Sequence, residues 1–300
     1  MTASPHSVLS RATAADIRLD PFPHLLIENA LDPELFDTLS REFPPVEVVT
    51  RGTELKNGKT GINCIDIVDN EAMSAAWREF CAYHSSREFF SDVTALFGDT
   101  IRTLYPFLEE DLGRPLDALE PKRRIMSERK AGHRQDDIVL DCQIMLDETS
   151  DPRICRGPHV DAVEELYAAL LYFRHPDDDS DGGELCVVRA RDPQRTYPAP
   201  DAIRVRHHPA EIDEADVEIV AKVPYRANTL IMFINSPASL HTVTVRSATP
   251  LMRRHVNIIG ETYALKRGGL FRVLQPGDPV EPPKPPTLTE RLLRKLGVGR

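Results

Sequence analysis

A histidine and an aspartate stand two residues apart at His159 and Asp161, directly after a glycine and a proline. In an extended segment, residues i and i+2 point to the same side, so both side chains can reach one ion while Val160 points away. A third ligand must come from elsewhere, and His241, which opens an alternating run after a turn, is the candidate. Two imidazoles and one carboxylate leave coordination positions open, which suits Fe(II) oxygen chemistry, although zinc accepts the same ligand types. The sequence therefore predicts a metal centre at His159, Asp161 and His241.

Two arginines, Arg253 and Arg254, follow His241 and precede the apolar run 255–259. An arginine that opens a core strand needs an anionic partner, because burying an unpaired guanidinium is costly. Its planar fork matches a carboxylate, which a dicarboxylate cosubstrate would supply. Strand alternation puts only one of the two neighbours inside. The position directly before the apolar run favours Arg254, with Arg253 as the fallback.

This order of His-x-Asp pair, distal histidine and strand-opening arginine resembles the 2-oxoglutarate and Fe(II) dependent oxygenases, above all their prolyl-4-hydroxylase-like branch. The run 168–174, the Gly-Gly-Glu-Leu turn at 182–185 and the segment 21–27 are similar to that branch too, so the resemblance spans residues 21–265. It implies that His159, Asp161 and His241 bind iron and that Arg254 binds the distal carboxylate of 2-oxoglutarate. Gln143 and Tyr172 are further candidates for cosubstrate contacts, and the alternative is that both are ordinary strand residues.

The resemblance implies a hydroxylase that uses Fe(II), 2-oxoglutarate and O2, with ascorbate as an optional reductant, and that releases succinate and CO2. In the related halogenases a small residue replaces the carboxylate ligand, so Asp161 favours hydroxylation. The substrate is a small molecule or a peptidyl group. Free amino acids, peptidyl proline, sugar-linked intermediates and natural-product precursors all stay open, because substrate contacts in such folds come from variable loops.

Two other functions compete with this one. A jelly-roll binding protein without turnover would not need all three ligand types together with the arginine. A cupin-like metalloenzyme that does not use 2-oxoglutarate would keep its activity when Arg254 is replaced by alanine. The hydroxylase interpretation instead predicts severe loss.

After Pro121 the chain consists of short apolar runs separated by turn signals. The expected strands are 124–128, 139–146, 168–174, 184–189, 218–223, 229–234, 242–246 and 255–262. These runs fit a double-stranded β-helix of the jelly-roll or cupin type. The fold class is therefore α+β, with this core and N-terminal supporting helices.

The part before Pro121 supplies the support. A strand is expected within 21–31, followed by a helix capped by Asp32 with Pro33 at its first position. A polar loop with three glycines comes next, and the helix-rich stretch 71–112 has a periodic apolar set suited to packing on one face of a sheet. We expect a flexible N-terminus at 1–20 and a single oxygenase domain at 21–275, divided into helix-rich support (21–120) and jelly-roll core (121–275).

The last segment, 276–300, is a proline-rich tether with a short basic amphipathic helix at 288–296. Docking of this helix on its own domain is expected, and a partner or a membrane surface are the alternatives. The 300 residues are 41% hydrophobic and 28% charged with a net charge of -10, which argues against a general nucleic-acid binder. No secretory signal or membrane span is visible, and the five cysteines are scattered without a CxxC pair, so we expect a cytoplasmic protein with reduced thiols. The oligomeric state is not indicated.

The acidic run 177–182 imitates half of a calcium loop but has Val188 where the bidentate glutamate belongs, so it is interpreted as a solvated turn. His207 and His208 would point opposite ways in a strand. Asn235 and Ser239 could touch substrate or stabilise their turn. A basic cluster is interpreted as a solvated strand face, with anion attraction as the alternative: Lys122, Arg123, Arg124, Arg129, Lys130 and Arg134.

Overall fold

The computed structural model describes residues 4–52, 58–126, 132–149, 157–192, 212–265 and 269–271. Its strands form a seven-stranded sheet of order β1-β8-β5-β10-β4-β2, with β3 parallel to β4, and a three-stranded sheet of order β7-β6-β9. The strand bounds are β1 His24–Glu28, β2 Lys59–Ile62, β3 Pro121–Arg123, β4 Ile138–Thr149, β5 Glu165–Tyr172, β6 Leu185–Ala190, β7 Val217–Val223, β8 Thr229–Ile234, β9 His241–Val243 and β10 Thr249–Glu261.

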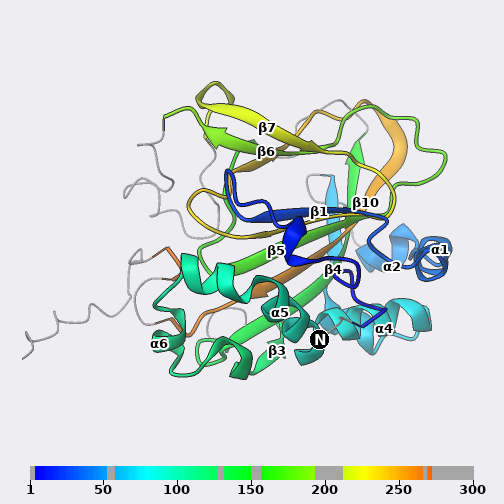
Figure 1. Cartoon of the computed structure of the whole chain (residues 1–300). Helices are drawn as coiled ribbons and strands as arrows, with labels where there is room; N and C mark the ends of the chain where they lie inside the picture. Colours follow the sequence, from blue (N-terminus) through cyan, green and yellow to red (C-terminus); the bar gives the residue numbers. More distant parts are fainter. Residues whose placement is uncertain are drawn as a thin grey trace, which may run out of the picture.

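The larger sheet is covered on both faces. In β5, Tyr167, Ala169 and Leu171 belong to the core shared with the helices, whereas Ala168 and Tyr172 pack with residues of β6 and β7. This follows from the two-residue period of a strand, which sends alternate side chains to opposite faces. Figure 1 shows the three resulting layers, with β6 and β7 above the larger sheet and the helices α4 and α5 below it.

The helices are α1 Pro33–Arg41, α2 Val46–Thr50, α3 Cys64–Val68, α4 Ala75–His84, α5 Arg87–Leu104 and α6 Leu108–Leu112, with 3-10 turns at Ala14–Asp16, Leu116–Ala118 and Glu214–Asp216. The Asp32 carboxylate accepts a hydrogen bond from the Glu34 amide, so the expected cap of α1 is confirmed. Trp77 of α4 is fully buried and donates its indole N–H to the carbonyl of Leu39. Its ring lies 5.2 Å from that of Phe173, which ties the helices to the end of β5.

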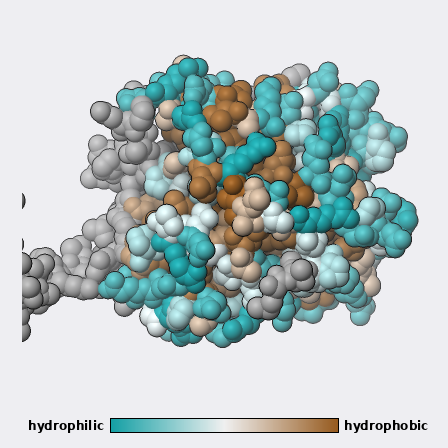
Figure 2. Space-filling view, viewed as in Figure 1, coloured by the Kyte–Doolittle hydropathy of each residue, from teal (hydrophilic) through white to brown (hydrophobic). Residues whose placement is uncertain are grey.

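Figure 2 shows hydrophobic side chains in the middle of this face of the molecule and hydrophilic ones around its rim. Among the described residues, no helix combines the length and hydropathy needed to cross a membrane.

The expectation of mixed α and β structure with a large sheet is confirmed. The strands expected between 139 and 262 correspond to β4 to β10. Two local expectations were wrong. Part of the polar glycine loop forms β2, which pairs with β4. The strand expected at 124–128 is absent from its described part, 124–126, and the neighbouring strand β3 ends at Arg123. The segment 276–300 lies outside the described residues, and the domain boundaries stay predictions.

Candidate metal centre

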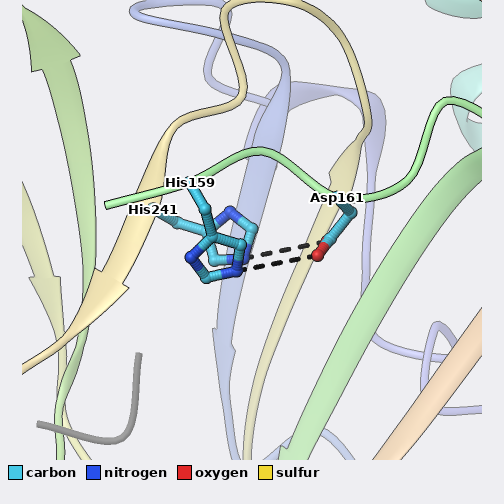
Figure 3. A group of neighbouring side chains, drawn as sticks. All are labelled: His159, Asp161 and His241. Atoms are coloured by element: carbon cyan, nitrogen blue, oxygen red, sulfur yellow. Dashed lines mark ion pairs between the residues drawn. The ribbon is translucent and has the colours of Figure 1, made fainter. Parts of the chain in front are cut away.

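Two segments far apart in the chain meet at the candidate metal centre. His159 and His241 form an antiparallel bridge, in which each backbone N–H donates to the other residue's carbonyl, at 3.0 and 2.9 Å. The bridge places the two imidazole rings side by side with their centroids 4.2 Å apart. Asp161 follows two residues after His159 and turns its carboxylate toward both rings (Figure 3). The three residues predicted from the sequence are therefore brought together.

The ring nitrogens are oriented for metal binding. The Nδ1 atom of His159 lies 2.7 Å from the Gly157 carbonyl, and that of His241 lies 3.0 Å from the Ser239 carbonyl. A carbonyl oxygen only accepts, so each Nδ1 atom carries a proton, and in the neutral ring this leaves the lone pair of Nε2 for a metal ion. The two Nε2 atoms lie 3.8 and 3.7 Å from oxygens of Asp161, contacts that Figure 3 marks with dashed lines.

The donor set fits a divalent metal ion. The three ligand atoms lie within 4.8 Å of one another, close enough for one ion to touch them all. The two histidines are buried and the Asp161 side chain is 14% exposed, so the three side chains are largely shielded from solvent. Two neutral imidazoles and one carboxylate suit non-haem iron, and zinc tolerates the same set.

Arg253 and Arg254 lie on opposite faces of β10. Val256 and Ile258, which share the parity of Arg254, belong to the core shared with the helices, whereas Ile259, which shares the parity of Arg253, packs between the two sheets. The Arg254 guanidinium accordingly stacks over the Phe43 ring at 4.9 Å. The arginine favoured from the sequence, Arg254, thus faces the helices, and the fallback, Arg253, faces the space between the two sheets.

Arg253 is held in an aromatic cage between the sheets. It is 2% exposed, and its guanidinium lies 5.0 Å from the centroid of Tyr172 and 5.1 Å from that of Tyr225. Its Nη1 atom donates to Asp147 at 3.2 Å. The cage is joined to the metal centre through Phe233, which packs with Tyr172 and Tyr225 and has its ring 4.9 Å from that of His241.

The charge state of this cage follows from its burial. Burial, assisted by the nearby charge of Arg253, lowers the pKa of His255 to about 3, so this ring is neutral and its Nδ1 atom accepts from Arg253. Burial also raises the pKa of Tyr172, with the charge of Arg253 opposing the shift. The cage therefore presents one guanidinium and a phenol beside it, which fits a carboxylate that shares the guanidinium with Asp147.

Gln143 lies on the same face of β4 as Asp147, the partner of Arg253, but it belongs to a different hydrogen-bond network. Its amide nitrogen donates to Asn63 and Asp141, and its oxygen accepts from Asn257. The buried Arg124 extends this network, because it pairs with Asp141 at 3.1 Å and with Glu261 at 3.0 Å. The sequence signal that could have revealed this network is the alternation in β4, where the polar residues Asp141, Gln143 and Asp147 occupy every other position between core residues.

Asp177, Asp179 and Asp181 are exposed, in agreement with a solvated turn, whereas Asp178 in the same run is buried and pairs with Arg246 at 2.7 Å. Arg124 is 4% exposed and ion-paired, so the interpretation of the basic cluster as a solvated face was wrong at this residue. His207, His208, Arg129 and Lys130 lie outside the described residues.

Comparisons with known proteins give the following. Neither the scan against family models nor the search of curated proteins finds a match. Among solved structures, the chain is similar to a Pseudomonas putida prolyl-4-hydroxylase, with 14% identity, a TM-score of 0.44 and coverage of 84% of this chain and 97% of that one. It is also similar to a Trichoplax adhaerens prolyl hydroxylase in complex with a hypoxia inducible factor peptide, with 12% identity, a TM-score of 0.39 and coverage of 83% and 88%.

A third similar structure is the epimerase SnoN in complex with Fe3+, alpha ketoglutarate and nogalamycin RO, with 12% identity, a TM-score of 0.45 and coverage of 90% and 91%. The solved structures that this chain resembles are thus prolyl-4-hydroxylases and other 2-oxoglutarate and Fe(II) oxygenases, the family named from the sequence motifs. These likenesses are too distant to carry an argument about function. The proposals below rest on the geometry of the site.

Proposed function

We propose that this protein is an Fe(II) and 2-oxoglutarate dependent dioxygenase that hydroxylates a small-molecule or peptidyl substrate and releases succinate and CO2. One observation carries the proposal: two imidazoles whose Nδ1 atoms bond to backbone carbonyls and one carboxylate converge from two distant segments. The buried Arg253 guanidinium between the two sheets supports it, because a dicarboxylate cosubstrate requires a cationic partner.

We also propose that the two sheets form a double-stranded β-helix. The His159–His241 bridge would then add the segment 157–161 as a fourth strand beside β9, so that the smaller sheet reads β7-β6-β9 followed by this segment. The metal ligands would lie at one end of the space between the sheets. A cytoplasmic location stays a prediction, and the four cysteines that the structure describes form no disulfide.

The chain's own residues would contribute in three ways. His159, Asp161 and His241 would hold the iron, which together with 2-oxoglutarate and O2 supplies the oxidising chemistry. Arg253 would orient the cosubstrate by its distal carboxylate, with Asp147 keeping the guanidinium in place. The apolar side chains between the sheets would keep water away from the reacting atoms.

The test measures succinate formed from 2-oxoglutarate by the purified protein with Fe(II), ascorbate and O2. We expect slow turnover without substrate, and loss of it in His241→Ala. Binding of Fe(II) without any binding of 2-oxoglutarate would indicate the cupin-like metalloenzyme instead. Failure to bind metal at all would leave the jelly-roll binding protein.

A further inference from the structure

Asn235 lies directly after β8 and is fully buried beside the metal centre. Its Nδ2 atom donates to the carbonyls of Ala162 and Glu165, each at 2.9 Å. Its Oδ1 atom lies 2.8 Å from the Ser239 hydroxyl, whose single proton it shares with the Ser236 carbonyl at 2.7 Å. The orientation of the amide is unambiguous, because the two carbonyls can only accept. One side chain therefore joins the loop that follows Asp161 to the turn that precedes His241.

Ser239 carries the connection to the histidine ring. Its hydroxyl also accepts from the Ser236 amide at 2.9 Å, and its carbonyl accepts from the Nδ1 atom of His241 at 3.0 Å. That last bond sets both the tautomer and the rotation of the imidazole. If the Asn235 amide moves, Ser239 moves with it, and the hydrogen bond from His241 to the Ser239 carbonyl changes.

The backbone of Asn235 is fastened as well. Its N–H donates to the Leu166 carbonyl at 3.0 Å, and its own carbonyl accepts from the Tyr105 hydroxyl. Tyr105 follows α5, so the helical layer holds Asn235 from the other side of the sheet. The amide is therefore a fixed support between two segments that carry metal ligands.

We propose that Asn235 is a positioning residue of the metal centre, which holds the carboxylate of Asp161 and the imidazole of His241 at the separation that one ion requires. Outer hydrogen-bond partners of this kind typically change metal affinity by about 10- to 100-fold when they are removed. The inference rests on the proposed function only in that the site must bind a metal ion.

A matched control lies at the opposite end of the same strand. Asn228, just before β8, is buried, and it brackets one residue by donating to the Leu31 carbonyl at 3.0 Å and accepting from the Leu31 amide at 2.9 Å. Its φ of 57° is unfavourable for alanine. Asn228→Ala therefore loses comparable bonds, adds backbone strain and touches no metal ligand, so it tests for a general loss of stability.

The experiment titrates the metal-free protein with Co(II) and follows the visible absorption of the complex, while thermal unfolding of the metal-free form is recorded for each variant. We expect Asn235→Ala to weaken Co(II) binding about 10- to 100-fold and to shift the absorption bands, whereas Asn228→Ala binds within about twofold of the wild type despite its lower unfolding temperature. Ser239→Ala, which removes only the hydroxyl, is expected to weaken Co(II) binding by an intermediate amount.

Wild-type affinity and unchanged bands in a folded Asn235→Ala protein would overturn the inference. If Asn235→Ala does not fold, Ser239→Ala decides, and wild-type affinity there has the same meaning. Failure of the wild-type protein itself to bind Co(II) would refute the metal centre, a result distinct from the failure of the positioning role.

Discussion

Replacing Arg253 by methionine should raise the dissociation constant of 2-oxoglutarate about 10- to 150-fold, whereas replacing Arg254 should leave it within about twofold. The first figure follows from the loss of a hydrogen-bonded charge pair between sheet layers, which contributes about 1.5–3 kcal/mol, with 1.4 kcal/mol for each factor of ten. The second follows from the placement of Arg254, whose guanidinium lies on Phe43 on the helix side of β10.

The Arg253→Met protein has a second defect that must be separated from the first. Asp147, which is 3% exposed, would lose its nearest guanidinium, and an uncompensated buried charge costs about 3–5 kcal/mol. The double variant Arg253→Met/Asp147→Leu removes both charges and should recover much of this stability. It should not recover the affinity for 2-oxoglutarate.

The assay is isothermal titration of 2-oxoglutarate into the protein loaded with Mn(II) under the same conditions for all variants. Metal affinity should stay within about twofold of wild type in both arginine variants, because neither residue is one of the three predicted ligands. Unchanged 2-oxoglutarate binding in Arg253→Met, or weakened binding in Arg254→Met alone, would refute the assignment of the aromatic cage to the cosubstrate.

Three further predictions concern the site and the fold. Asp161→Ala should abolish tight Co(II) binding in a calorimetric titration while leaving the unfolding temperature of the metal-free protein nearly unchanged, and retained affinity would exclude Asp161 as a ligand. Burial lowers the pKa of His84 to about 3, and its neutral ring accepts from the Val8 amide, so stability should fall as pH drops from 6.5 towards 3, by about 1.4 kcal/mol per pH unit for this group. Denaturant unfolding at several pH values checks this, and His84→Gln should flatten the dependence. Trp77→Ala should cost about 3–5 kcal/mol, because this side chain of α4 is fully buried against α1 and Phe173, and a smaller loss by chemical denaturation would contradict that packing.

The candidate ligands could be picked out in the sequence because local geometry relates two of them. His159 and Asp161 are two residues apart, so any extended backbone turns them to one side, and His241 was marked by the turn before it. The long apolar strands and the capped helix α1 were predicted for the same reason, since their period and cap residues act over a few positions. The weakly patterned strand β2 was missed, because Lys59–Ile62 becomes a strand only through its pairing with β4.

By itself, then, the sequence determined which residue types could bind a metal, that one of two adjacent arginines must face inward, and where the main elements lie. Only the tertiary structure decided that Arg253 is the one that faces the space between the sheets. Alternation puts the two arginines on opposite faces of β10, and the packing of Val256 and Ile258 against the helices shows that Arg254 is on the helix side. The tertiary structure also decided that Arg124 is a buried partner of Asp141 and Glu261, a charge assembly that forms between segments remote in the chain. Such pairings depend on strand register across the sheet, and no local pattern of the sequence contains that register.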